Sequence, residues 1–147
     1  MTVQQPWNLV HVLSHAEHRI GRRIAALLAT EGMSVETWRV LSLLADGAGH
    51  PMTAIADFAL MPPPSLTKLV DRLVSDNLVY RRADPADRRR VLVHLTARGR
   101  ISQQRAQRLV DREQAALLAA IGDAGDLVAA LDRLRTATED TAAVRPH

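Results

Sequence analysis

The chain has 147 residues, a formal net charge of +3 and no cysteine, and 47% of its residues are hydrophobic whereas 3% are aromatic. This length suits one domain with its own core, and a core poor in aromatic residues has to be built from Leu, Val, Ile and Ala, which favours a mainly helical fold. The absence of cysteine excludes disulfides, thiolate zinc sites, thiolate nucleophiles and direct thiol redox sensing.

The sequence contains no segment typical of export or membrane insertion. The first ten residues, MTVQQPWNLV, lack the basic and apolar regions of a signal peptide. No stretch approaches the roughly 18 consecutive apolar residues of a membrane span. We therefore expect a cytoplasmic protein that does not contact a membrane.

Two amphipathic helices are predicted before residue 47. Apolar residues recur every three or four positions from Trp7 to about Ala29, which is helical spacing. Ser34 then has the character of an N-cap, since its side chain can accept the backbone N–H of Thr37 three residues later. The second helix has an inward apolar stripe made of Val35, Trp38, Leu41 and Leu44.

Two further helices are expected on either side of three prolines. A short helix from about Thr53 is expected to be stopped by Pro62-Pro63-Pro64, because proline has no N–H. The next helix is predicted to begin at Pro64 or Ser65 and to end where Asn77 adopts a left-handed conformation. Its buried stripe is predicted to be Leu66, Leu69, Val70 and Leu73, and its outer face Lys68, Asp71, Arg72 and Ser75.

A β-hairpin and two helices complete the predicted order. Residues 78–82 and 91–95 have strand-forming patterns and are separated by turn-forming residues and three consecutive arginines. Thr96 is expected to cap a long helix from about residue 97 to residue 121. A last helix carries the apolar residues Leu127, Val128, Leu131 and Leu134.

The positive charge is concentrated in one part of the chain. Residues 68–112 hold 12 of the 19 Lys and Arg and 5 of the 16 Asp and Glu, a net charge of +7, whereas the rest of the chain has a net charge of −4. A basic segment in an otherwise mildly acidic protein favours a polyanionic partner. The alternative is a solvated charged surface without such a partner.

Residues 53–95 have the order of a helix-turn-helix followed by a wing. The second helix is short and polar enough for a major groove about 12 Å wide, and its N-terminus is expected to offer unpaired N–H groups to a phosphate. Strand alternation is expected to separate Arg89 from Arg88 and Arg90, so we assign Arg89 to a minor groove and its neighbours to phosphates. The predicted DNA-binding residues are Ser65, Thr67, Lys68, Arg72, Arg88, Arg89 and Arg90.

The segment SLTKLVDRLVSDNLVYRRADPADRRRVLVHLTARG resembles the winged-helix core of the MarR family of bacterial transcription regulators. The motifs that match are Val70-Asp71-Arg72-Leu73, Leu78-Val79-Tyr80-Arg81, Asp84-Pro85-Ala86-Asp87-Arg88-Arg89 and Leu95-Thr96-Ala97-Arg98-Gly99. Asn77 stands where the family usually has Gly, and Met61-Pro62-Pro63-Pro64 is an unusually stiff connection before the recognition helix. The helices before and after this segment also fit, so the resemblance covers nearly the whole chain.

The resemblance implies a mainly α winged helix-turn-helix fold of about six helices plus a β-hairpin, as a single domain of residues 1–147. Residues 34–99 would form the DNA-binding lobe, and residues 1–31 and 100–147 the dimerisation helices. In the wing, the resemblance implies that Asp87 and Arg89 act as a functional pair. It also implies that Asp71 orients an arginine; the alternative is a solvent-facing charge on the helix.

The resemblance also implies a function: a sequence-specific regulator, and by the family's usual mode a repressor, that binds a pseudo-palindromic operator as a homodimer. The first helix and the last two carry apolar stripes that a winged-helix core cannot cover alone, so we expect a second copy to bury them. Many relatives release DNA when a small aromatic or phenolic acid binds between the dimer helices and the DNA-binding lobe. The residues expected at that location here are His11, His15, Trp38, Arg39 and Leu41.

Other function classes find little support in the sequence. The HExxH, GxSxG and phosphate-loop patterns are absent, so we expect neither an enzyme nor a cofactor. His11, His15 and His18 share a helix face with spacing that permits a metal site, but we interpret them as surface or interface histidines. Two alternatives remain: a nonspecific architectural DNA binder, and a winged helix used for protein contact.

Overall fold

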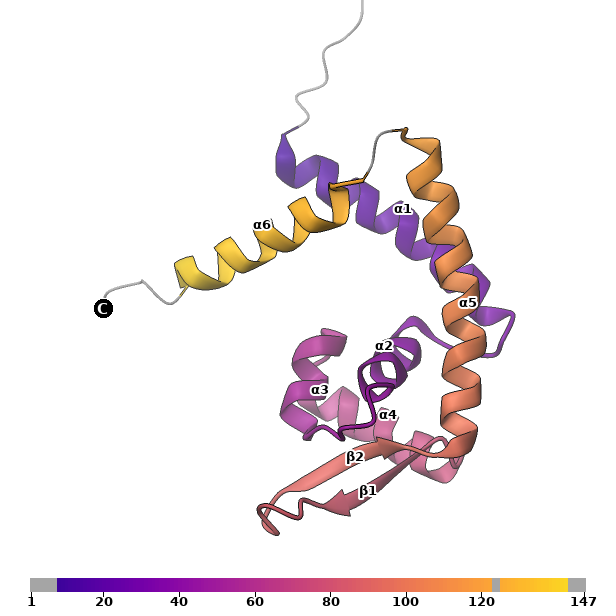
Figure 1. The fold of residues 1–147 in the computed structure, drawn as a ribbon, viewed down its shortest axis with the longest axis vertical. Helices are drawn as coiled ribbons and strands as arrows, with labels where there is room; N and C mark the ends of the chain where they lie inside the picture. The colour runs from indigo at the N-terminus through magenta and orange to yellow at the C-terminus, as the bar shows by residue number, and fades with distance from the viewer. Residues whose placement is uncertain (1–7, 123–124, 143–147) are drawn as a thin grey trace, which may run out of the picture. The chain divides into compact units, whose positions relative to one another are not determined.

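The computed structural model describes residues 8–122 and 125–142. The chain forms two compact units, residues 1–111 and 112–147. The described elements are α1 (Leu9–Ala29), α2 (Val35–Leu44), α3 (Met52–Ala59), α4 (Pro63–Ser75), β1 (Val79–Ala83), β2 (Val91–Leu95), α5 (Ala97–Ala120) and α6 (Leu127–Ala142) (Figure 1). This order confirms the predicted fold class, helices interrupted by one hairpin.

Side-chain caps begin the first two helices. Asn8 accepts the backbone N–H of His11 at 3.1 Å and so opens α1, while the predicted start at Trp7 lies outside the described residues. Ser34 Oγ accepts the N–H of Thr37 at 3.0 Å, which confirms the predicted N-cap of α2. Each cap satisfies one backbone N–H that has no partner inside its own helix.

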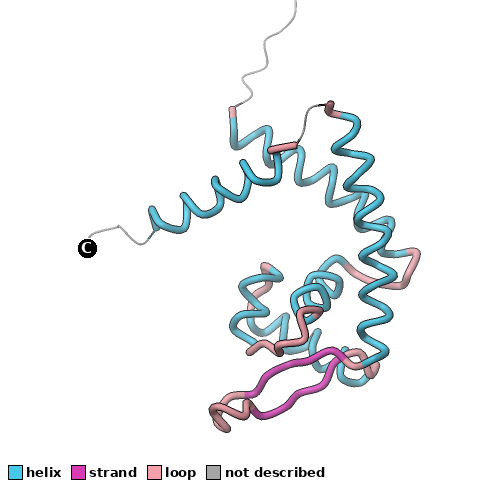
Figure 2. The backbone as a smooth tube through the Cα atoms, in the orientation of Figure 1, coloured by secondary structure: helices cyan, strands magenta, loops and turns pink. Residues whose placement is uncertain are grey.

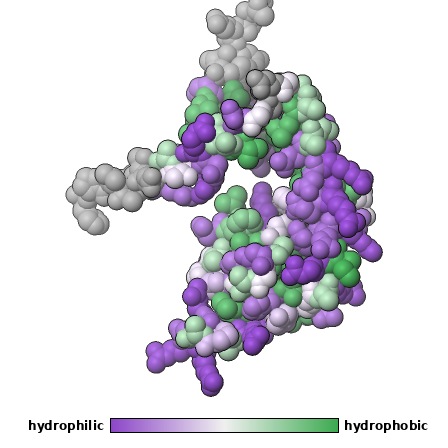
Figure 3. Space-filling model, in the orientation of Figure 1, coloured by the Kyte–Doolittle hydropathy of each residue, from purple (hydrophilic) through white to green (hydrophobic). Residues whose placement is uncertain are grey.

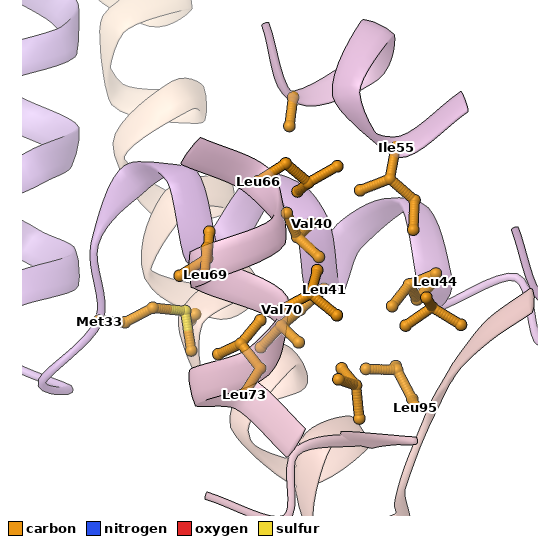
Figure 4. Packing of buried hydrophobic residues seen from close by; sticks show 14 of the residues in the cluster. Met33, Val40, Leu41, Leu44, Ile55, Leu66, Leu69, Val70, Leu73 and Leu95 are labelled. Atoms are coloured by element: carbon orange, nitrogen blue, oxygen red, sulfur yellow. The ribbon is translucent and has the colours of Figure 1, made fainter. Parts of the chain in front are cut away.

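The first unit has one hydrophobic core, gathered between α2, α3, α4 and the hairpin (Figure 4). The predicted inner stripe of α4 is confirmed, because all four of its members are buried. Ile24 and Leu28 from α1 and Ala106 and Val110 from α5 join the same core. Each fully buried leucine contributes about 2 kcal/mol of transfer free energy, so this stripe anchors α4 while leaving its other faces exposed.

The turn between α3 and α4 differs from the prediction. A left-handed residue, Leu60 with φ of 56°, ends α3 before the prolines are reached. The N–H of Met61 returns to the carbonyl oxygen of Ala56 at 3.0 Å, as in a Schellman motif. The prolines serve the next helix instead: Pro62 is the N-cap of α4, and Pro63 and Pro64 lie in its first turn. Proline is tolerated there because first-turn N–H groups have no intrahelical acceptor.

The hairpin pairs β1 with β2 in antiparallel register, from Val79 opposite Leu95 to Ala83 opposite Val91 (Figure 2). β1 therefore begins one residue later than predicted. His50 makes an isolated bridge to Val93 from the loop after α2, with N–H···O distances of 3.1 and 2.8 Å. In the same loop, Asp46 accepts the backbone N–H of Ala48, and its Oδ2 atom lies 2.7 Å from Nε2 of His50. The hydrogen bond from Ala48 is the main cause that holds the pKa of Asp46 below its usual value, and the contact with His50 adds to it.

The end of α4, the start of β1 and the start of α5 meet in one junction. Asn77 has a φ of 58°, which confirms the predicted left-handed residue. The hydroxyl of Thr96 donates to the carbonyl oxygen of Asn77 at 2.6 Å and accepts the N–H of Gly99 at 2.9 Å, so the predicted cap of α5 is confirmed. A Cβ atom on Gly99 would lie 1.9 Å from the carbonyl oxygen of Leu78. Residue 99 must therefore be glycine for these elements to approach so closely.

The second unit contains the end of α5 and α6. On α6, Arg135 forms ion pairs with Asp132 at 2.9 Å and Glu139 at 2.7 Å, three and four residues away on the same helix. The predicted apolar residues Leu127, Val128 and Leu131 are exposed in the single chain. Among the described residues, no helix is both long and apolar enough to cross a membrane.

Two helical glycines should respond to alanine in opposite directions. Gly99→Ala should lower the free energy of unfolding by about 3 kcal/mol, because the new methyl group overlaps a backbone oxygen. Gly21→Ala should raise it by about 0.5–1 kcal/mol, because the nearest atom is the mobile carboxylate oxygen of Glu17 at 3.4 Å and alanine favours the helix. Urea titration of both variants at one protein concentration tests this pair, and equal stability of the two would contradict it.

Candidate nucleic-acid interface

The outer face of α4 is polar and lies opposite its buried stripe. Lys68, Asp71, Arg72 and Ser75 are all exposed, as predicted from helical spacing. Ser65 and Thr67, also predicted to contact DNA, are exposed near the start of the helix. The Thr67 hydroxyl donates to the carbonyl oxygen of Pro63 at 3.0 Å. The helix is 13 residues long, about 20 Å at 1.5 Å per residue, a size that fits into a DNA major groove.

The N-terminus of α4 does not offer the expected row of unpaired N–H groups. Residues 62, 63 and 64 are prolines and have none, and the N–H of Leu66 already bonds the carbonyl oxygen of Pro62 at 3.1 Å. Only Ser65 can present a first-turn N–H to a phosphate. The expectation was wrong because three of the positions that usually carry unpaired N–H groups are prolines here.

The three consecutive arginines lie in the turn at the tip of the hairpin and not on a strand, since β2 begins at Val91. Strand alternation therefore does not separate Arg89 from its neighbours, which corrects that part of the prediction. Asp87 Oδ1 accepts the N–H of Arg89 at 3.1 Å, and its carbonyl oxygen accepts the N–H of Arg90 at 2.9 Å. All three arginine side chains are exposed, and the hairpin tip is strongly hydrophilic (Figure 3).

A second turn closes the base of this loop. Asp84 Oδ1 accepts the N–H of Ala86 at 2.9 Å, and the N–H of Asp84 donates to the carbonyl oxygen of Arg90 at 2.8 Å. The two aspartates thus hold the backbone of the tip through backbone N–H groups, as in Asx turns. The guanidinium groups of Arg88 and Arg89 are not needed for the shape of the loop.

An ion pair connects α4 to the wing. Arg81 on β1 donates from Nη2 to Asp71 Oδ1 at 2.5 Å. Sequence reasoning associated Asp71 with an arginine but named no partner, and the structure gives Arg81. Both side chains are more than a third exposed, so the pair contributes little to stability. The ion pair instead helps to fix the position of the wing relative to α4.

A hollow of about 390 Å³ lies along one side of α4. Ser65, Lys68 and Arg72 contribute to its wall from α4, and Ser34 and Glu36 contribute from the start of α2. Met61 and Leu69 complete its lining. The hollow therefore continues the basic outer face of α4 towards the N-terminus of α2.

The predicted ligand residues are not all placed at a surface. His11 and His15 are exposed on α1, and Arg39 is half-buried on α2. Trp38 is also half-buried, and its Nε1 donates to Gln107 Oε1 on α5 at 3.2 Å. Leu41 is fully buried in the core, so it packs the fold and does not line an open cleft. The part of the chain that the structure describes contains no group of three or more His, Cys, Asp or Glu residues that could hold a metal ion.

Three helices packed over a β-hairpin, with a polar helix and a basic hairpin tip left exposed, define a winged helix-turn-helix DNA-binding protein. The sequence profile of the MarR family matches residues 31–90. The chain is 32% identical over 88 residues to the transcriptional regulator MhqR of Bacillus subtilis. The aligned segment covers 60% of this chain and 61% of MhqR.

Two solved structures extend this similarity along the chain. The transcriptional repressor CouR bound to a 23-mer DNA duplex is 27% identical, with a TM-score of 0.74, and the match covers 89% of this chain and 92% of CouR. NadR in complex with 4-hydroxyphenylacetate is 25% identical, with a TM-score of 0.75, and the match covers 99% and 100% of the two chains. In its matched segment and in its fold, the chain is therefore similar to the MarR family of DNA-binding transcriptional regulators.

The Asp71–Arg81 pair should matter more for binding than for folding. Asp71→Asn should change the free energy of unfolding by less than about 1 kcal/mol, since the pair is exposed. It should nevertheless weaken DNA binding, because the wing is then held to α4 at its base alone, where Thr96 bonds the carbonyl oxygen of Asn77. Removal of an acidic charge alone would strengthen binding to a polyanion, so tighter binding by Asp71→Asn would contradict a positioning role. Asp76→Asn, an exposed carboxylate at the end of the same helix, is the matched control.

Proposed function

We propose that the protein is a ligand-responsive repressor that acts in the cytoplasm and binds a pseudo-palindromic operator as a homodimer. The observation that carries the proposal is the exposure, from one folded unit, of both a polar α4 and a hairpin tip with three adjacent arginines. α4 would lie in the major groove, with Ser65, Thr67, Lys68 and Arg72 towards the DNA. Arg88, Arg89 and Arg90 would reach the adjacent minor groove and its phosphates.

Support for the major-groove assignment comes from the charges around α4. Lys68 and Arg72 are exposed on its outer surface and line the same hollow. A DNA backbone that passes along this hollow would place a phosphate within reach of Ser34 and Ser65 as well. Phosphate contacts of this kind position a protein on the duplex, whereas base contacts specify the sequence.

The homodimer is supported by apolar side chains that the single chain leaves exposed. In the first unit these are Leu9, Val10, Val12 and Ile20 on α1, and in the second unit they are Leu127, Val128 and Leu131 on α6. A soluble regulator gains stability when such stripes are covered by a second copy. Two-fold symmetry would then require half-sites about one helical turn apart.

The effector is proposed to be a small aromatic or phenolic acid. The support is similarity to NadR, whose structure contains 4-hydroxyphenylacetate. His11, His15, Trp38 and Arg39 remain the proposed contacts, since they offer ring nitrogens, an indole face and a guanidinium for a carboxylate. Leu41 is left out of this set because it is buried.

Nonspecific architectural binding is the second candidate, and it would use the same basic tip. It predicts steep salt dependence without preference between duplexes, whereas a specific regulator should prefer its operator by roughly 10³-fold or more. A winged helix used only for protein contact predicts no binding to any duplex. Fluorescence-anisotropy titration of the full chain against its own upstream DNA and a shuffled duplex, at several salt concentrations, separates these alternatives. If both duplexes bind equally, selection from random duplexes tests whether a preferred operator lies elsewhere.

In the same titration, Arg89→Ala should weaken binding to the preferred duplex by about 1–3 kcal/mol, because an arginine in a narrow minor groove loses a strong electrostatic contact. The dimer should stay intact by sedimentation. Arg135→Ala is the matched control, since it removes the same charge from α6, where Arg135 is paired within its own helix. Unchanged affinity of the Arg89 variant would remove Arg89 from the interface.

Leu131→Asp should shift the protein from dimer to monomer, because it places a charge on an exposed apolar stripe of α6. Sedimentation velocity across a range of protein concentrations measures the shift. Leu60→Asp is the matched control: Leu60 is more exposed, at 77%, but lies in the turn before α4. An intact dimer in the Leu131 variant would show that this side of α6 is outside the interface.

A further inference from the structure

We infer that Pro64, together with the methyl group of Thr67, reads the 5-methyl group of a thymine in each operator half-site. The inference rests on the proposed binding of α4 in the major groove. It assigns a specificity role to a residue that sequence reasoning treated only as a stiff start to the helix.

The first step is the position of Pro64 on α4. Residues 64, 68, 71 and 75 follow one another at intervals of four, three and four, so they form one stripe along the helix. All four are exposed, whereas the stripe of Leu66, Leu69, Val70 and Leu73 on the opposite side is buried. Pro64 therefore occupies the N-terminal end of the outermost stripe. In helix-turn-helix proteins this end of the recognition helix contacts base edges.

The second step is the chemistry available at that end. Pro62, Pro63 and Pro64 have no N–H, so the backbone presents no donor before Ser65. Ser65 lies one residue further on and to one side of Pro64, where it lines the hollow together with Ser34 and Lys68. The hydroxyl of Thr67 donates to the carbonyl oxygen of Pro63 at 3.0 Å, so its proton is already used. What remains is an apolar surface, made of the Pro64 ring and the Thr67 methyl group.

The third step is the partner that such a surface can recognise. The major-groove edges of all four base pairs carry hydrogen-bonding groups, and the C5-methyl of thymine is the apolar group among them. A proline ring can exclude water from this methyl group and cannot satisfy the polar edge of guanine or cytosine. The side chain also loses little conformational freedom on binding, because its atoms are closed into the pyrrolidine ring.

The expected size of the effect follows from burial of one methyl group. At about 0.8 kcal/mol per buried CH₂ unit, loss of the methyl should weaken binding about fourfold in each half-site. Deoxyuridine in place of thymidine removes this group and leaves the base pair intact. A change in both half-sites should therefore weaken binding of a dimer by roughly 15-fold.

The experiment uses the full chain and the tightest duplex from selection among random sequences. Each thymine is replaced in turn by deoxyuridine, and affinity is measured for the wild type, Pro64→Ala and Pro63→Ala. Pro63 undergoes the same change in the same turn but lies to the flank of the outermost stripe, one residue before Pro64. We expect one thymine per half-site at which uracil weakens binding about fourfold for the wild type and the Pro63 variant, and not for the Pro64 variant.

Three outcomes would overturn the inference. If no replacement of a thymine by uracil weakens binding of the wild type, no thymine methyl group is recognised. This result is obtained with the wild type and so does not depend on whether a variant folds. An effect that persists undiminished in Pro64→Ala would assign the methyl contact to another residue. A selection that enriches no sequence would overturn the proposed operator-specific function itself, and the inference with it, whereas the first two results leave that function standing.

Discussion

The approach of Gly99 to the carbonyl oxygen of Leu78 is the constraint on which the DNA-binding geometry depends. Residue 99 lies in the first turn of α5 and residue 78 immediately precedes β1, and a side chain at residue 99 would begin 1.9 Å from that oxygen. Thr96 closes the same junction through a hydrogen bond to Asn77, just beyond the end of α4. The C-terminal end of α4, the base of the wing and the first turn of α5 are thereby held at fixed angles. Asp71 and Arg81 add a second connection between α4 and the wing from the surface side.

Folding and recognition use different atoms of the same elements. α4 is anchored by four buried apolar side chains, and its polar side chains make no contribution to that core. At the hairpin tip, Asp84 and Asp87 accept backbone N–H groups and shape the loop, while the exposed arginine side chains remain available for phosphates. A phosphate partner would therefore meet charges whose positions are already limited by the backbone, which lowers the entropy that binding has to overcome.

Much of the local structure could be predicted from the sequence, because the contacts that determine it join residues only a few positions apart in the chain. The caps at Ser34 and Thr96, the left-handed Asn77 and the buried stripe of α4 all follow from spacing and residue type. The left-handed Leu60 does not, since leucine rarely adopts that conformation and only the surrounding packing selects it. The Asp71–Arg81 partnership was also beyond reach, because it joins residues on two elements whose relative position is set by the junction.

Other differences arose where one rule was applied without a second. The prolines were expected to stop the helix before them and to start the next at Pro64 or Ser65, whereas Leu60 ends α3 and α4 begins at Pro63. Strand alternation was applied to the three arginines, although Asp84 and Asp87 just before them favour turns. Leu41 was placed near a ligand by location, although its position in the apolar stripe of α2 required burial.

The separation of the two stripes on α4 has an evolutionary consequence. Residues 64, 68 and 75 can be exchanged by single mutations without disturbing the buried stripe, so if α4 reads DNA as proposed, descendants of this protein could acquire new target sites at little cost in stability. Residue 99 allows no such exchange, because every other side chain would push the wing away from α4. Divergence would thus alter the outer surface of α4, while the angle at which that surface is presented stays constant.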